Sequence, residues 1–422
     1  MSKQQDKIIT DPVHGFIAVP RPRLLELIQT DEVQRLRRIR QLGVGHYVYP
    51  GAEHSRFGHA LGAMALMRDA LDSLREKGTP IDANEYEAAL AAALLHDIGH
   101  GPYSHTLEHA LISGLQHEAM SRSLIVRLRD RFEMPLDLTL KMFDDTYERP
   151  FFHRLISSQL DMDRLDYLRR DSFYTGVAEG KIGVPRIIQS LRVHGPNEEL
   201  VVEEKGIYAV ESFLISRRLM YWQVYLHKTV IAGDQLLRSI LARARRLIAD
   251  SRSDASGMSN VLEFFLSSGG GNDGSLTAEQ VDNYSRLDDT DVLYSIKRWS
   301  RSTDPVLADL SRRFLNRDFL RVTFLDAPAT ELELSAMSGA VADWLGRELS
   351  LTAAESRELV PYYLTSGLSQ HSAYRTQHQS IRVLSRTGRV RELSEIADSP
   401  SVSALSEFEE KPYVCMPRIE RN

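Results

Sequence analysis

The decisive stretch of this sequence is LLHDIGHGPYSH, Leu94–His105. The alanines and leucines that lead into it predict an apolar helix ending at His96 and Asp97. Two glycines then let the backbone turn sharply and present His100 and His105. A neutral imidazole beside a carboxylate suits a borderline divalent metal, so this helix end is a candidate metal site.

Two side chains from other segments are expected to complete that site. His59 adds an imidazole from the preceding predicted helix, and Asp163 adds a carboxylate from SSQLDMDRLDYLRRD. The single cysteine, Cys415, excludes a thiolate cage and an internal disulfide. The predicted ligands are therefore His59, His96, Asp97 and Asp163, with further positions open to water or phosphate oxygens. They suit one divalent transition metal, and Fe, Mn, Zn, Ni and Co are not distinguished by the sequence.

Side chains at helical spacing predict a pocket wall beside the metal. Asp163, Tyr167 and Arg170 lie three to four residues apart and Asp171 follows, so one helix face is expected to carry them. This stripe of acid, phenol and base is more consistent with a pocket than with a core face.

Basic and imidazole groups near the ligands point to phosphate chemistry. Arg56 precedes His59 by one helical turn, and its fork of donors suits a phosphoryl group. The alternative for Arg56 is a surface salt bridge with Glu53 or Asp69. His117-Glu118 forms a second imidazole–carboxylate pair, although on its own it also fits an ordinary helix surface.

Helical periodicity dominates the remaining sequence. Helices are expected at 24–42 (broken at Thr30-Asp31), 55–77, 84–96, 105–131, 152–171, 184–193, 211–250 and 336–348. Asn84 with Glu87 is the expected cap of the fourth. Short β segments are expected at 14–19, 319–325 and 381–384, with a hairpin formed by 199–203 and 207–210.

The domain division is predicted from two polar, glycine- and serine-rich segments, 249–260 and 268–276. They separate a catalytic lobe with its N-terminal segment, 1–250, from a C-terminal lobe, 251–422. The expected fold class is mainly α, with short β-hairpins and a mixed α/β C-terminal lobe.

Composition excludes several classes of protein. The hydrophobic fraction of 42% and charged fraction of 26% are ordinary for a globular chain. The formal net charge of −6 argues against a dedicated nucleic-acid binder. The N-terminus, MSKQQDKIITDPVHG, lacks the apolar core of a signal peptide, so a cytoplasmic protein without a membrane partner is expected.

Five blocks in order resemble the HD-domain deoxynucleoside triphosphate triphosphohydrolases, which include the human sterile-alpha-motif and HD-domain enzyme. The blocks lie within residues 7–240 and read KIITDPVHGFIAV, QRLRRIRQLGVGHYVYPGAEHSRFGHALG, ALLHDIGHGPYSHTLEH, LDMDRLDYLRRDSFYTG and RRLMYWQVYLHK. The resemblance implies an HD-domain helical core. It also implies cleavage between the α-phosphorus and the 5′-oxygen, which yields a deoxynucleoside and inorganic triphosphate.

The resemblance assigns roles position by position. His59, His96, Asp97 and Asp163 match the metal ligands. The phosphate-binding positions are Arg56, Arg164 and Arg217, with Lys228 as a further candidate. The catalytic candidates around the α-phosphate are His100, His105, His117 and Glu118; either His105 or His117 could be the general acid, and His117 occupies the family's catalytic position. The sugar and nucleoside contacts are Gln41, Leu42, Tyr167, Asp171 and Tyr225.

Two positions depart from the human enzyme. Leu226 replaces a glutamine that contacts the sugar 3′-OH, and Gln29 replaces an aspartate that recognises a regulatory guanine, although Gln34 and Arg37 match. The resemblance implies a homo-oligomer, dimer or tetramer, that is allosterically activated by a regulatory nucleotide, with Mg²⁺ accompanying the dNTP substrate.

Other functions remain open at this point. The nearest alternative is hydrolysis of another nucleotide phosphoester, a monophosphate or an alarmone. A non-catalytic nucleotide sensor is an alternative from a different class, and single-stranded nucleic acid is a further candidate partner.

Overall fold

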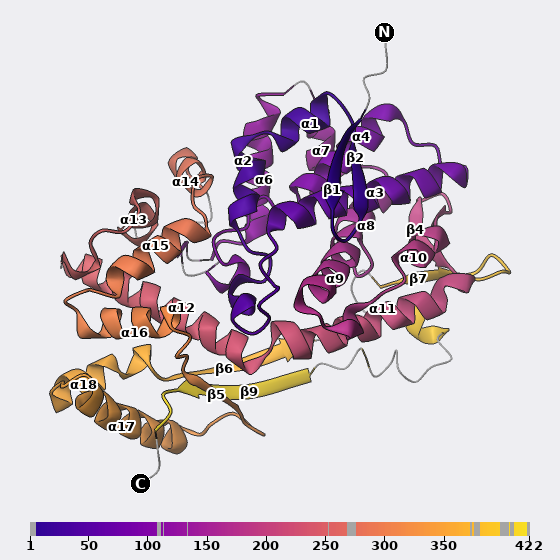
Figure 1. The fold of residues 1–422 in the computed structure, drawn as a ribbon. Coiled ribbons are helices and arrows are strands. Elements are labelled where there is room, and N and C mark those ends of the chain that lie inside the picture. The colour runs from indigo at the N-terminus through magenta and orange to yellow at the C-terminus, as the bar shows by residue number, and fades with distance from the viewer. Residues whose placement is uncertain are drawn as a thin grey trace.

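The computed structural model describes residues 6–107, 111–112, 114–132, 134–251, 253–267, 276–371, 374, 380–396, 405 and 409–419. Helices predominate and the strands are short (Figure 1). The helices are α1 (Arg23–Ile28), α2 (Asp31–Arg35), α3 (Arg56–Glu76), α4 (Ala83–Leu95), α6 (His117–Arg129), α7 (Leu136–Phe143), α8 (Phe151–Ile156), α9 (Met162–Thr175), α10 (Val184–Ser190), α11 (Ile207–Met220), α12 (Lys228–Ala249), α13 (Asn260–Ser267), α14 (Ala278–Tyr284), α15 (Asp289–Trp299), α16 (Pro305–Leu315), α17 (Glu331–Glu348) and α18 (Ala353–Leu359). The strands are β1 (Lys7–Asp11), β2 (Gly15–Val19), β3 (Leu191–His194), β4 (Glu199–Glu203), β5 (Arg321–Phe324), β6 (Thr365–His371), β7 (Arg382–Leu384), β8 (Val390–Glu392) and β9 (Glu409–Met416). This architecture confirms the predicted fold class.

The described strands form three small sheets, ordered β1-β2, β3-β4-β7-β8 and β5-β9-β6. The predicted hairpin of 199–203 with 207–210 is wrong, because β4 pairs antiparallel with β3 and residue 207 begins α11. A tight turn at Gly195 and Glu198, both with positive φ, reverses the chain between β3 and β4. The backbone at Gly206 then packs so tightly on Ser190 that a Cβ would lie 2.5 Å from that side chain's Cβ.

Several helix boundaries follow from local capping. The break at Thr30 is confirmed, since its hydroxyl accepts a hydrogen bond from Val33 N at the start of α2. The predicted cap of α4 is wrong by two residues. Asp82, not Asn84, is the N-cap, and it forms a capping box with Glu85.

Three predicted helices are interrupted. Segment 211–250 divides into α11, which ends at Met220, and α12, which begins at Lys228. Segment 105–131 contains a 3₁₀ turn, Ser104–Thr106, and the regular helix α6 begins only at His117. Segment 152–171 divides into α8 and α9 because the Asp161 carboxylate caps α9, accepting hydrogen bonds from Ser158 N and Arg164 N, both at 2.7 Å. That interruption places Asp163 in the first turn of a new helix.

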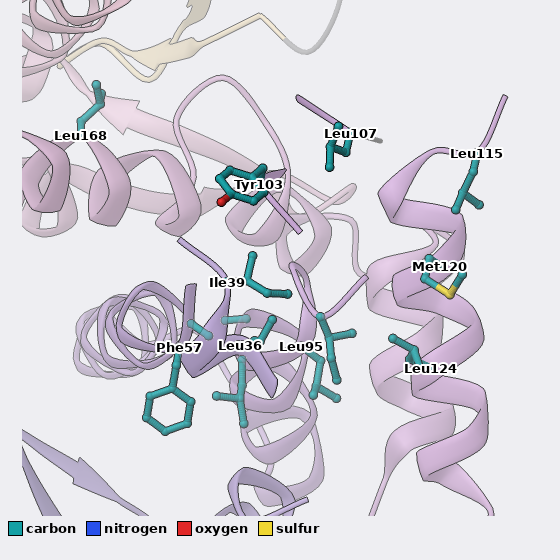
Figure 2. Packing of buried hydrophobic residues seen from close by; sticks show 14 of the residues in the cluster. Leu36, Ile39, Phe57, Leu95, Tyr103, Leu107, Leu115, Met120, Leu124 and Leu168 are labelled. Atoms are coloured by element: carbon teal, nitrogen blue, oxygen red, sulfur yellow. The ribbon is translucent and has the colours of Figure 1, made fainter. Parts of the chain in front are cut away.

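A continuous apolar core supports the helix ends that carry function. Figure 2 shows Leu36, Ile39 and Leu95 close together, with Tyr103 above them and Met120 on the neighbouring α6. All five side chains are almost completely buried. The core therefore fixes the end of α4 against the start of α6.

Helix α12 runs across the middle of the molecule, with the sheet β5-β9-β6 beneath it (Figure 1). It packs against α13, α16 and β5, and also against the 3₁₀ turn Gly43–Tyr47. The division at residue 250 stays a prediction, since buried residues on both sides of it join one hydrophobic cluster. Neither α12 nor any other described helix is long and apolar enough to cross a membrane.

The Asp234 carboxyl on α12 gives a pH-dependent stability. Burial raises its pKa to about 6, although Thr106 Oγ1 donates a hydrogen bond to it at 2.6 Å. Because an unfolded aspartate titrates near pH 3.9, the folded state holds the extra proton between about pH 4 and pH 6. The protonated Asp234 carboxyl therefore contributes to the stability of the folded state below that window. This contribution is lost as pH rises from about 4 to about 6. We expect Asp234→Asn to be more stable than the wild type at pH 7.5, by about 1 kcal/mol, and equal to it near pH 4.

Urea unfolding at pH 4.5 and 7.5 measures this difference. Asp250→Asn, which changes a half-exposed carboxylate one residue beyond the same helix, is the matched control. A stability difference between Asp234→Asn and the wild type that does not change with pH would contradict the assignment.

Candidate active site

Helices α3, α4 and α9 bring the predicted metal ligands to one point. His59 lies in the first turns of α3, His96 is the C-cap of α4, and Asp163 lies in the first turn of α9. Asp97 follows His96 directly. Because α3 packs against both α4 and α9, residues far apart in the sequence meet here.

The spacing of the ligand atoms fits a single cation. His59 Nε2 lies 3.3 Å from His96 Nε2, 3.1 Å from Asp163 Oδ1 and 3.5 Å from Asp97 Oδ2. His96 Nε2 lies 3.3 Å from Asp97 Oδ1 and 3.5 Å from Asp163 Oδ1. Donor atoms of a tetrahedral site with bonds near 2.1 Å are about 3.4 Å apart. His59, His96 and Asp163 can therefore surround one divalent metal, and Asp97, which adjoins them, forms a second possible group with His100 and His117.

Hydrogen bonds on the far side of each imidazole orient both rings. His59 Nδ1 donates to Asp166 Oδ2 at 2.7 Å, and His96 Nδ1 donates to the Ala93 carbonyl oxygen at 2.8 Å. These bonds fix the tautomer that leaves each Nε2 lone pair facing the cluster. Two lone pairs and two carboxylates gathered in this way form a donor set that suits a cation.

The charges of the cluster lead to the same conclusion. Burial disfavours protonation of His59, but hydrogen bonds with Asp163 and Asp166 raise its pKa to about 10. Burial likewise opposes ionisation of Asp163, yet contacts with His59 and His96 hold the pKa of that carboxyl below its usual range. The carboxylates thus attract positive charge, which a divalent metal supplies in place of protons. The donors suit Fe, Mn, Zn, Ni or Co.

Asp166 connects the cluster to the N-terminal hairpin. Its Oδ1 lies 2.6 Å from His14 Nε2, and its Oδ2 accepts a hydrogen bond from Arg170 Nε at 2.9 Å. Arg170 Nη1 also donates to Asp11 Oδ2 at 2.8 Å. The role of Asp11 and His14 was missed from sequence, where their segment contributed only to the family resemblance.

We expect Asp166→Asn to weaken metal binding by about 10–100-fold, because His59 would lose the acceptor that orients it. Chelator-competition titration measures the affinity, and activity should return at excess metal. His14→Ala, which removes a contact to the other carboxylate oxygen, should have a smaller effect. Asp69→Asn, a half-exposed carboxylate on α3, is the control. Equal affinities in Asp166→Asn and Asp69→Asn would refute this role.

One hollow of about 690 Å³ opens beside the metal cluster. Most of the predicted site residues line it: Gln41, Leu42, Arg56, His96, Asp97, His100, His117, Glu118, Asp163, Arg164, Tyr167, Asp171 and Tyr225. Sequence reasoning missed other lining residues: Ala119, Arg122, Phe143, Asp144, His153, Ile156, Ser157 and Tyr221. His153 is the imidazole among these, and it lies outside every recognised motif.

A pair of imidazoles lines the hollow beside the metal cluster. The rings of His100 and His117 lie 3.9 Å apart, and His100 Nδ1 is 3.3 Å from Asp97 Oδ1. Burial and the charge of Arg56 hold the pKa of His100 well below its usual value, so His100 is neutral. His117 is partly exposed and lies 3.4 Å from Glu118 Oε2.

Gly99 allows this pair to form through close packing. A Cβ at residue 99 would lie 2.2 Å from the His117 carbonyl oxygen and 2.3 Å from Ser121 N. The chain turns after α4 as predicted, but neither Gly99 nor Gly101 has a positive φ, so the turn does not depend on a left-handed backbone there. The glycine instead lets the end of α4 touch the start of α6.

The far end of the hollow is polar and aromatic. Asp171 Oδ1 lies 2.8 Å from His54 Nε2, and Asp171 Oδ2 accepts a hydrogen bond from the Tyr225 hydroxyl at 2.7 Å. The rings of Tyr225 and Tyr167 meet edge to face with centroids 6.2 Å apart. Gln41 Oε1 is buried and has no hydrogen-bond partner among the described residues. A π-helical turn, Tyr221–Tyr225, positions the Tyr225 ring, and α9 positions that of Tyr167.

The structure excludes the alternative role of Arg56 and corrects the predicted position of Arg170. Arg56 forms no salt bridge with Glu53 or Asp69; it is buried, contacts Asp97 through Nη1, and donates from Nε to Ser104 Oγ at 2.8 Å. Arg170 was expected on the pocket wall, but it faces Asp166 instead. Positions 163, 167 and 171 share one face of α9, whereas 166 and 170 share another.

Among the described residues, Arg217 and Lys228 do not line the hollow, and His59 lies buried in the metal cluster beside it. Arg217 lies behind Tyr221, its guanidinium 5.9 Å from that ring's centre. Lys228 lies over the Phe324 ring at 5.3 Å. The His105 side chain falls outside the described part of the chain.

Comparisons with known proteins agree with this geometry. The HD domain family matches residues 56–169, and the HD associated region matches residues 182–263. The Bacillus subtilis protein YwfO is 34% identical over 426 residues, covering 97% of this chain and 92% of YwfO. A crystal structure of a phosphohydrolase from Bacteroides thetaiotaomicron is 40% identical, with a TM-score of 0.90, and covers 98% of this chain and 100% of that one.

This chain is also similar, more distantly, to an enzyme with a named activity. Human deoxynucleoside triphosphate triphosphohydrolase SAMHD1 is 28% identical over 280 residues, 56% of this chain and 44% of that enzyme. The metal cluster lies within the matched HD domain, and the near relatives span almost the whole chain. This chain therefore belongs to the metal-dependent HD-domain phosphohydrolases that carry an HD-associated region.

Proposed function

We propose that this enzyme hydrolyses deoxynucleoside triphosphates to a deoxynucleoside and inorganic triphosphate. The observation that carries the proposal is the composition of one hollow. A metal cluster, the His100–His117 pair and Arg164 line it together with Gln41, Leu42, Asp171 and Tyr225. Phosphate-binding and sugar-binding chemistry thus share a space within the range typical of small-molecule sites. The similarity to SAMHD1 supports the same substrate class.

Different residues would hold the metal and bind the polyphosphate. A divalent metal held by His59, His96, Asp97 and Asp163 would lower the pKa of a bound water and polarise a phosphoryl oxygen. Arg164, held in place by the Asp161 carboxylate, binds the polyphosphate. Burial opposes the charge on Arg164, but Asp161 raises the pKa of its guanidinium, so the charge is permanent.

Bond cleavage requires proton delivery to the leaving group. A water oxygen forms a bond to the α-phosphorus, the bond from phosphorus to the 5′-oxygen breaks, and the 5′-oxygen takes up a proton. His117 lies in the hollow beside the neutral His100 and is partly exposed, so it can donate this proton and regain it from solvent.

The sugar end of the hollow selects the substrate. The Asp171 carboxylate and the Tyr225 hydroxyl form one hydrogen-bonded unit, and Gln41 offers a buried acceptor for a sugar hydroxyl. Leu42 adds an apolar contact at the same end, which disfavours the additional polar 2′-hydroxyl of a ribose. The proposed preference is therefore for deoxyribose over ribose.

A product assay tests the proposed function. Metal-loaded enzyme incubated with each of the four dNTPs, with and without GTP or a second dNTP, should release triphosphate and a deoxynucleoside. Pyrophosphate release would overturn the proposal, and phosphate release from monophosphates alone would favour a different phosphoester substrate. Activation by a nucleotide and assembly into an oligomer stay predictions, which the GTP arms and the measured mass would test.

A further inference from the structure

A second hollow lies on the opposite side of α8 from the catalytic one. Its volume is about 470 Å³, and it lies between α8 with the segment after it, the β3–β4 hairpin, and β7. The residues that line it are Pro150, Phe151, Arg154, Ser158, Leu160, Leu191, Asn197, Glu199, Leu200, Val201, Val202, Ser380, Ile381 and Arg382. None of these was assigned a role in the reaction.

Arg154 distinguishes this hollow from a simple surface depression. Its Nη1 atom is buried and has no hydrogen-bond partner among the described residues, which also provide it with no ion pair. By contrast, Arg149 on the same side of α8 binds both Glu85 and Glu198, and Arg382 lies 3.2 Å from Glu199 Oε1. A buried N–H group without an acceptor is costly even though the Arg154 side chain as a whole is only partly buried, so an anion is the ligand this position favours.

The other lining groups indicate what kind of anion would fit. Ser158, Ser380 and Asn197 add hydroxyl and amide donors to the guanidinium of Arg154. Glu199, the one carboxylate of the lining, lies 3.2 Å from Arg382, so the remaining donors suit the three terminal oxygens of a phosphate ester. Leucine, valine and isoleucine side chains supply an apolar surface for the rest of the molecule, and the volume suits a small metabolite.

We propose that this second hollow binds a small organic phosphate, with the phosphate on Arg154 and its apolar part against the β3–β4 hairpin. The site is distinct from the catalytic hollow, and it does not depend on which phosphoester the enzyme cleaves.

Helix α8 gives the ligand a direct connection to catalysis. His153, Ile156 and Ser157 face the catalytic hollow, whereas Arg154 and Ser158 face the second one. Ser158 N donates to the Asp161 carboxylate that caps α9. The Asp161 cap therefore connects Ser158, in the second hollow, to the first turn of the helix that carries the predicted metal ligand Asp163.

Phenylphosphonate is a suitable probe, because it carries the anionic head on an apolar body and its P–C bond resists phosphoester hydrolysis. Equilibrium dialysis with the full-length metal-loaded protein should show a binding component that Arg154→Ala weakens at least 10-fold. Asn197→Asp, at an exposed position, should also weaken it through charge repulsion. Arg286→Ala, a mostly exposed arginine away from both hollows, should leave it unchanged.

Two comparisons make the test decisive. His96→Ala, which disrupts the catalytic centre, should retain the Arg154-dependent component, so failure of the proposed function leaves this result intact. Inorganic phosphate should bind more weakly than phenylphosphonate, and benzoate more weakly still. Identical phenylphosphonate binding in the wild type, Arg154→Ala and Asn197→Asp would overturn the proposal, as would a component lost only in His96→Ala.

Discussion

Asp163→Ala is expected to remove the bound metal and to lower kcat/KM by about 10³-fold or more, which corresponds to ~4 kcal/mol of transition-state stabilisation. Asp163 supplies the carboxylate oxygen that lies nearest to His59 Nε2, at 3.1 Å. Without it, two imidazole lone pairs and the Asp97 carboxylate remain, and the donor set loses one of its two negative charges. The remaining ligands should hold a divalent cation too weakly to survive purification.

Metal content by mass spectrometry, measured beside dNTP turnover, checks this expectation. Asp250→Ala removes an exposed carboxylate far along the chain and serves as the control for general charge effects. His96→Ala should behave as Asp163→Ala does, because both ligands contact the same His59 nitrogen. An Asp163→Ala protein with full metal occupancy and near-normal turnover would remove the basis of the candidate site.

The ligand positions could be predicted because their local chemistry is unusual. A histidine and an aspartate at the end of an apolar helix, followed by glycines, have few structural explanations, and His59 and Asp163 lie in segments with equally dense polar patterns. These segments meet because the apolar faces of α3, α4 and α9 pack together, and those faces can be recognised from the spacing of apolar residues in the sequence.

Features that depend on tertiary contacts could not be predicted in the same way. His153 enters the hollow because α8 is separated from α9 by the Asp161 cap, and nothing in the sequence near residue 153 signals a site. Arg170 was placed on the wrong face because three- and four-residue spacings diverge over two turns. The role of Asp11 and His14 required knowing that the β1–β2 hairpin folds back onto α9, a contact between residues more than 150 positions apart.

His117→Ala is expected to lower kcat by about 10²–10⁴-fold while leaving metal content unchanged. The 5′-alkoxide is a poor leaving group, and His117 is the partly exposed imidazole that lines the hollow directly beside His100. It lies one ring away from the metal ligands, so its loss removes a proton donor without removing a donor atom to the metal. Asp163→Ala and His117→Ala should therefore have similar activities but opposite metal contents.

Matched variants separate proton donation from packing. His117→Gln keeps a hydrogen-bonding side chain of similar size but cannot deliver a proton, so it should be as impaired as His117→Ala. Glu118→Gln alters a side chain that is 61% exposed and should retain most of the activity. With a substrate whose leaving group needs no proton, such as a p-nitrophenyl phosphoester, the rate of His117→Ala should fall far less than it falls with a dNTP. Equal losses with both substrates would show that His117 positions the substrate and that the proton comes from another group, for which His105 is the next residue to replace.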